Sequence, residues 1–133
     1  MTMEELFGEV ISSYSRAQAI ADGVLVDLSE WAGAGPGGMM GGFKIPVAIT
    51  QALWTTIESI PESQKGHQDV RGRAHDVLWM ASCAARSGGK RSRVPFEVLM
   101  HVREGKRKLR LLIDVGPGDR AEPVVTIGYP EDF

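Results

Sequence analysis

The sequence has little of what secreted, membrane-spanning or disulfide-stabilised proteins carry. Its 133 residues include one cysteine, Cys83, which excludes a disulfide within the chain and favours a reducing compartment. No stretch approaches the roughly 18 to 20 uncharged apolar residues that a membrane-spanning helix needs. Residues 1–9 carry three glutamates and no basic flank, unlike a targeting signal. We therefore expect a soluble, cytoplasmic protein without a membrane partner.

Patterns for metal binding and catalysis are also missing. His67, His75 and His101 lack the spacing of a helical metal site, and no second cysteine could complete a zinc knuckle. They are predicted to be separate, solvent-facing residues. His75 and Asp76 are neighbours on a predicted helix and point about 100° apart, which argues against a triad with Ser82. We predict no catalytic residue, no metal and no cofactor, and an enzyme is the less favoured class.

The charges that are present are unevenly distributed. Residues 1–69 hold nine acids and three bases, whereas residues 86–110 hold nine bases and two acids. Such asymmetry indicates a charged partner. The bases could contact an acidic protein surface, neutralise nucleic-acid phosphates, or only protect a sheet edge in water. The candidate basic surface comprises Lys90, Arg91, Arg93, Lys106, Arg107, Lys108 and Arg110. The sequence does not decide whether its two groups merge.

The first part of the chain predicts a small strand-helix-strand unit. Apolar runs favour short strands over residues 10–14 and 24–28. Between them, Ser15 can cap a helix over residues 16–22 by accepting a free backbone N–H. Gly23 stands where a helix end favours a left-handed residue.

The rest of the chain predicts helices followed by strands. Apolar residues recur near helical spacing over residues 46–60 and 69–86. The period then changes to two over residues 94–103, 109–115 and 125–129, which is typical of strands. We predict a single α+β domain, residues 1–133, in which a three-stranded antiparallel meander packs against two main helices.

Two further features concern partners. Residues 33–42 are rich in glycine and are predicted to form a mobile loop. Beside or within it, Trp31, Met39, Met40 and Phe43 could form an adaptable apolar surface for a partner. The alternative is that this loop folds its own apolar residues onto the domain.

Self-association is a separate prediction. Leu99, Leu112 and Val124 fall on the nominally polar side of the meander, where a second copy could cover them in a homodimer.

Two segments carry a resemblance to a known family. Residues 14–29, YSRAQAIADGVLVDLS, resemble the opening motif of an uncharacterised family of small bacterial proteins, and residues 42–50, GFKIPVAIT, resemble its second landmark. The resemblance implies an origin on plasmids, phages or integrated mobile elements. It implies no activity and no catalytic residues.

The same opening motif has a physical interpretation. The predicted unit could bring Tyr14, Arg16 and Asp27 together, either as a structural ion pair or, with Lys44, as the lining of a small cleft. Three functions therefore stay open. The favoured one is a non-enzymatic accessory protein of a mobile element that contacts another protein. The others are a nucleic-acid-binding protein that uses the basic hairpin, and a small enzyme or ligand binder with that cleft.

Overall fold

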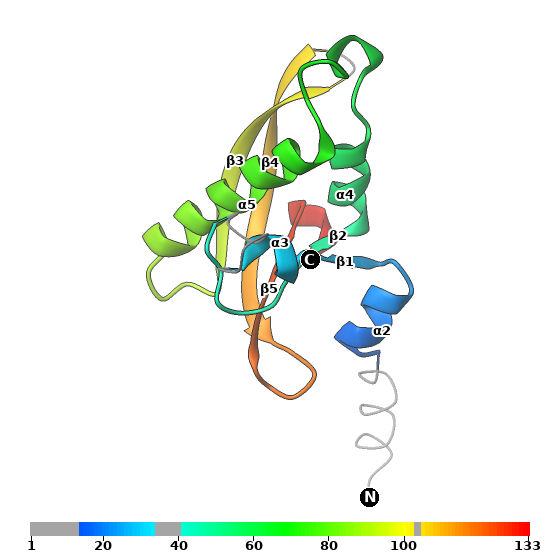
Figure 1. The fold of residues 1–133 in the computed structure, drawn as a ribbon. Coiled ribbons are helices and arrows are strands. Elements are labelled where there is room, and N and C mark those ends of the chain that lie inside the picture. Colours follow the sequence, from blue (N-terminus) through cyan, green and yellow to red (C-terminus); the bar gives the residue numbers. More distant parts are fainter. Residues whose placement is uncertain (1–13, 34–40, 103–104) are drawn as a thin grey trace, which may run out of the picture.

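The computed structural model describes residues 14–33, 41–102 and 105–133 as a mixed α+β fold built on one five-stranded sheet (Figure 1). The α+β class predicted from the sequence is thereby confirmed. The strands are β1 (Leu25–Asp27), β2 (Val47–Thr50), β3 (Arg93–Val102), β4 (Gly105–Pro117) and β5 (Pro123–Gly128). The α-helices are α2 (Arg16–Ala21), α3 (Ser29–Ala32), α4 (Gln51–Glu58) and α5 (Val70–Ser87), and short 3-10 turns are η1 (Glu62–Gln64) and η2 (Pro130–Asp132).

The strand order across the sheet is β1-β2-β5-β4-β3. The last three strands of the chain are antiparallel neighbours in chain order, and β3 with β4 forms a long hairpin (Figure 1). On the other side of β5, β2 runs parallel to it, and β1 runs antiparallel to β2. The sheet is therefore mixed, and β5 occupies its centre.

One row of apolar side chains crosses the whole sheet and supplies much of the core. The register aligns Val94 with Ile113, then Ile127, Ile49 and Val26, one residue from each strand. The first four are buried, and Val26 packs against their cluster. Since side chains alternate between faces, the residues beside them point to the opposite face of the sheet.

Helix α5 covers β3 and β4 on the core face (Figure 1). Its apolar stripe, including Val77 and Leu78, is fully buried against the sheet. Asp69 caps its start, because the carboxylate oxygen Oδ1 accepts the N–H of Gly72 at 2.6 Å. The helix predicted over residues 69–86 is confirmed.

The helix predicted over residues 46–60 was wrong in its first part. Residues Val47–Thr50 form β2, and only Gln51–Glu58 are helical. All four residues of β2 are buried, so this inner strand shows no alternation of apolar and polar residues that would reveal it. Thr50 ends the strand and caps α4, because its hydroxyl accepts the N–H of Leu53. The sheet is consequently larger than the predicted three-stranded meander.

The predicted N-terminal unit is described only in part. Ser15 and Gln18 form the capping box of α2, and Gly23 follows with a φ of 78°, both as expected. The predicted strand over residues 10–14 and the centre of the glycine-rich loop, residues 34–40, lie outside the described residues. Within the part of the chain that is described, no helix combines the length and apolar character needed to cross a membrane.

Candidate functional site: a basic notch beside β4

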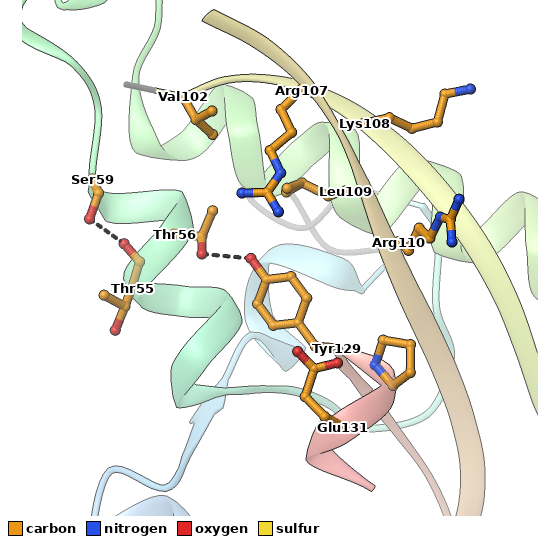
Figure 2. A pocket seen from close by; sticks show the side chains of 11 residues that line it. Thr55, Thr56, Ser59, Val102, Arg107, Lys108, Leu109, Arg110, Tyr129 and Glu131 are labelled. Atoms are coloured by element: carbon orange, nitrogen blue, oxygen red, sulfur yellow. Dashed lines mark hydrogen bonds between the residues drawn. The ribbon is translucent and has the colours of Figure 1, made fainter. Parts of the chain in front are cut away.

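In the described structure, the first part of β4 has no neighbouring strand on the side that faces away from β3. Pairing between β4 and β5 ends at Leu112 and Gly128, although β4 begins seven residues earlier at Gly105. A cavity of about 690 Å³ opens beside this stretch (Figure 2). We call it the notch. Its walls come from three separate parts of the chain: α4 and Ser59, the β3–β4 hairpin, and the segment that follows β5.

Backbone groups of β4 face the notch. Proline has no N–H and is tolerated in sheets where that missing donor faces away from a paired strand. Pro95 stands opposite Leu112, so the backbone groups of this pair point outward from the hairpin. Residues two apart share that direction, and Lys108 and Arg110 therefore aim their N–H and C=O groups beyond the end of β5 into the notch.

The notch carries an excess of positive charge. Arg107, Lys108 and Arg110 line it, against one acid, Glu131. Lys108 Nζ lies 3.4 Å from a carboxylate oxygen of Glu97 across the hairpin. The side chains of Arg107 and Arg110 are exposed and form no hydrogen bond or ion pair with any other described residue. Figure 2 shows the Arg107 guanidinium directed toward the space between β4 and α4.

Hydroxyl groups form the opposite wall. The hydroxyls of Thr56 and Tyr129 share a hydrogen bond of 2.7 Å, which ties α4 to the residue after β5 (Figure 2). Ser59 donates from its hydroxyl to the carbonyl of Thr55 at 2.6 Å. The lining thus combines cationic guanidinium groups with hydroxyls, a set suited to carboxylates and other anionic oxygen groups.

A buried arginine holds this wall in place. Arg73 of α5 donates to the carbonyls of Thr56, Ile57 and Ser59 at the end of α4, and to the carbonyl of His101 in β3. Carbonyls at a helix end lack partners within the helix, and the guanidinium satisfies them. Burial lowers the pKa of Arg73. The side chain therefore joins both helices to the hairpin.

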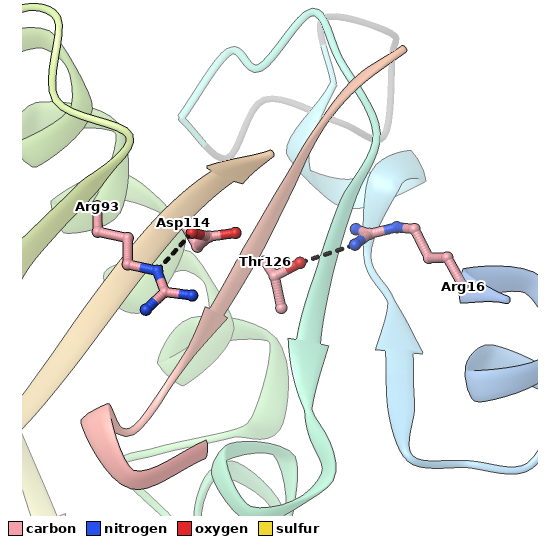
Figure 3. Close-up of polar contacts among 4 residues, drawn as sticks. All are labelled: Arg16, Arg93, Asp114 and Thr126. Carbon is pink, nitrogen blue, oxygen red and sulfur yellow. Dashed lines mark hydrogen bonds and ion pairs between the residues drawn. The ribbon is translucent and has the colours of Figure 1, made fainter. Parts of the chain in front are cut away.

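The two basic groups predicted from the sequence do not merge along the hairpin. Arg93 pairs with Asp114 near one end, whereas Lys106 pairs with His101 eight residues along β3, about 27 Å away. Arg93 Nε also lies 2.9 Å from the Asp114 carboxylate (Figure 3). Lys90 and Arg91 precede Arg93, so they belong to that far end. Three residues of the second group, Arg107, Lys108 and Arg110, line the notch, and Lys106 lines a different cavity.

Arg16, predicted for a cleft, binds the sheet instead. Its guanidinium donates to the hydroxyl of Thr126 at 2.7 Å and to the carbonyl of Val125 at 2.6 Å (Figure 3). Burial lowers the pKa of Arg16, while nearby carboxylates, Asp27 first among them, act in the opposite direction. Asp27 thus lies in electrostatic range, but no direct ion pair joins the two residues in the described structure.

The other residues of the predicted cleft have different neighbours. The Tyr14 hydroxyl donates to Asp22 at 2.9 Å, and this bond raises the pKa of Tyr14. Asp27 accepts the N–H of Ser29, and Lys44 is exposed. The contacts described here do not bring the four residues together, and the cleft stays a prediction.

The predicted apolar partner surface is described for two of its four residues. Trp31 and Phe43 are partly buried against the core. The Trp31 ring lies 6.3 Å from that of Trp54, and the Arg71 guanidinium lies 5.5 Å from the Trp31 ring. Met39 and Met40 lie outside the described residues, so this surface also stays a prediction.

The three histidines, which are far apart in the sequence and were predicted to be separate, lie around one cavity in the structure. His67, His75 and His101 all line one cavity of about 510 Å³, together with Asp69 and Asp76. Within the described ranges, no three such side chains lie close enough to hold a metal ion. Sequence reasoning missed this convergence because it depends on the packing of α5 against β3. It also missed the hydroxyl wall of the notch, whose residues show no motif.

Fold and site together define a mixed α+β protein with a basic surface notch beside an incompletely paired strand. A model of a family of unknown function, DUF6573, matches residues 3–133. The chain therefore belongs to that family. No curated protein and no solved structure matches the chain.

Proposed function

We propose that the protein is a non-enzymatic accessory protein of a mobile genetic element, acting in the cytoplasm by binding an acidic segment of another protein in the notch. The mobile-element setting is supported by the resemblance of residues 14–29 to a family found on such elements. The binding role is supported by one observation above others: Arg107 and Arg110 both line the notch, from opposite faces of β4, and their side chains have no hydrogen-bond or ion-pair partner among the described residues.

An extended segment suits the shape of the site. A segment lying beside β4 could pair with the backbone groups of Lys108 and Arg110, which β5 does not reach. Its side chains would then alternate between two surroundings. Those on one side would meet Lys108 and Arg110, and those on the other would meet Arg107, Leu109 and the hydroxyl wall. The expected ligand therefore alternates acidic and small apolar residues.

Binding of a defined peptide tests this function. A short fluorescein-labelled peptide of alternating glutamate and valine is titrated with the protein, and fluorescence anisotropy gives the affinity. Arg107→Glu with Arg110→Glu is expected to weaken binding at least about a hundredfold, since each arginine can supply a charge-assisted hydrogen bond.

A charge-matched control separates the notch from general electrostatic attraction. Lys90→Glu with Arg91→Glu changes net charge equally at the far end of the hairpin. The proposal predicts an affinity within about twofold of the original for this variant. Equal losses in both variants, or no binding by the original protein at low salt, would contradict the proposed site.

Nucleic acid is the second candidate, and one observation favours it. Lys106, Lys108 and Arg110 alternate along β4, about 6.8 Å apart, and so could follow a phosphate backbone. A salt titration with single-stranded DNA and RNA tests this candidate. Tight binding whose affinity falls steeply with salt, and which the glutamate-valine peptide cannot compete away, would favour nucleic acid over protein.

A further inference from the structure

The outer edge of β3 carries an apolar groove that the proposed function does not use. β3 is the last strand of the described sheet, and all ten of its residues pair with β4 on one side only. A cavity of about 560 Å³ runs along the free side, between this edge and α5. Three large apolar side chains at the groove are well exposed: Leu99 (61%), Trp79 (47%) and Met80 (40%).

The backbone of β3 is available for pairing along much of this edge, with the His101 carbonyl bound to Arg73 at one end. Pro95 has no N–H and stands at a position whose backbone groups face away from β4. Residues two apart along the strand share this orientation. Glu97, Leu99 and His101 therefore aim their N–H and C=O groups at the free side, where the His101 carbonyl already accepts a hydrogen bond from Arg73. A strand added here would pair with both backbone groups of Glu97 and Leu99 and with the N–H of His101, three alternate residues whose side chains share one face of the sheet.

We propose that a second copy of this chain occupies the groove, with its β3 antiparallel to the first and Leu99 on the two-fold axis. In this register Leu99 meets Leu99 of the second copy. Glu97 lies opposite His101 of the second copy, and the same pair recurs on the other side of the axis, as an isologous interface requires. An imidazole N–H can donate to each carboxylate.

Complementarity at the edge favours a second copy in this register. Moving the axis to Glu97 would place two carboxylates directly opposite each other, which is unfavourable. Centring on Leu99 removes that repulsion and covers the most exposed large apolar side chain of the described chain. On the helix side, Trp79 and Met80 of each copy flank the new pair of strands. The two sheets become continuous, and an edge open to uncontrolled pairing is closed.

The mass in solution provides the first test. Light scattering coupled to size exclusion should give twice the 14.5 kDa mass of the chain at micromolar concentration. Leu99→Lys should give the single-chain mass, because a lysine would face its own copy at the axis. Val24→Lys is the matched control, since Val24 is an exposed apolar residue (48%) outside the groove. It should remain dimeric, and circular dichroism should show that all three proteins are folded.

A charge exchange tests the register. Glu97→Lys and His101→Glu should each weaken dimerisation at least about tenfold, by placing unmatched or like charges opposite each other. The two changes in one chain should restore the dimer, and so should an equimolar mixture of the two single variants. Only an interface that pairs these residues between copies gives both rescues.

Two results would overturn the proposal. One is a single-chain mass for the original protein at high concentration. The other is a dimer that survives Leu99→Lys or shows no rescue by the charge exchange, which would place any interface elsewhere. The proposal is independent of peptide binding, because the groove and the notch share only the Lys108 side chain.

Discussion

The two edges of one hairpin differ in chemistry although they belong to the same pair of strands. Where β4 has no described neighbour beyond β3, the residues whose backbone N–H and C=O groups point away from β3 are basic, including Lys108 and Arg110. Hydroxyl groups form the opposite wall of the notch. Along β3, the corresponding residues are Glu97, Leu99 and His101, beside exposed Trp79 of α5. A charged, hydrated edge suits a reversible acidic ligand, whereas an apolar, self-complementary edge suits a lasting contact between copies.

The difference also shows how each edge arises. The notch exists because β5 is six residues long and β4 is thirteen, so the shorter strand leaves the longer one uncovered. The outer groove exists because β3 is the last strand of the described sheet and α5 lies beside it. Both edges depend on the same core and on Arg73. A variant of the core or of Arg73 should therefore disturb both edges, whereas a variant of one edge should disturb that edge alone.

The largest expected effect comes from the core that both edges share. Ile113→Ala removes a buried side chain from the apolar row in β4 and should lower the free energy of unfolding by about 4 kcal/mol. Urea denaturation followed by circular dichroism measures the change. Val24→Ala is the control, since that side chain is about half exposed (48%) and lines neither edge, and should change stability by about 0.5 kcal/mol or less. Similar losses for both would contradict the assigned core.

Removing the shared arginine should have the next largest effect. Arg73→Ala leaves the carbonyls of Thr56, Ile57 and His101 without this donor and should cost about 3 kcal/mol of stability. Lys65→Ala, which breaks only an exposed pair with Glu62, should cost about 0.5 kcal/mol or less. An equal effect of the two changes in urea denaturation would show that Arg73 does not organise the end of α4.

Variants confined to one edge should leave the other intact. Arg107→Glu with Arg110→Glu should abolish peptide binding while the protein stays dimeric. Leu99→Lys should give the single-chain mass while its affinity for the glutamate-valine peptide changes by less than about threefold. Anisotropy and light scattering on the same samples check both statements. Loss of both properties in either variant would mean that the edges form one site.

The smallest expected effect concerns acid and α2. Asp119 accepts the N–H groups of Arg16 and Ala17, and these bonds hold the pKa of its carboxyl below the ordinary value. The contribution of the Asp119 carboxylate to stability is therefore complete above the ordinary aspartate pKa. It is lost as pH falls through the lowered pKa that Asp119 has in the folded protein. The protection factors of the α2 amides, which are corrected for the intrinsic pH dependence of exchange, should fall in acid, and Asp119→Asn should flatten that dependence. Unchanged pH dependence in the variant would assign it to other groups.

The sequence predicted the elements whose patterns are local. The cap at Ser15, the turn at Gly23, α5 and the alternating strands of the hairpin each follow from neighbouring residues. β2 was missed because a strand buried on both faces looks like the start of an apolar helix, and because its parallel pairing with β5 joins residues nearly eighty positions apart.

The sites were harder to predict than the elements. The basic residues of the notch were identified, but their separation from Arg93 follows only from strand register. The hydroxyl wall needs α4 beside Tyr129, and the convergence of the histidines needs α5 beside β3. Exposure of Leu99 agrees with its predicted place on the polar side, and Val124, which precedes the core residue Val125, lies on that side too but is buried there.

Backbone amide exchange on adding the acidic peptide tests the central claim most directly. NMR of the full chain, with and without saturating glutamate-valine peptide, reports each amide separately. Binding in the notch predicts slower exchange at Lys108 and Arg110, with Glu97 and Leu99 unchanged. Protection at Lys90 and Arg91, or along β3, or at no amide of β4, would contradict it.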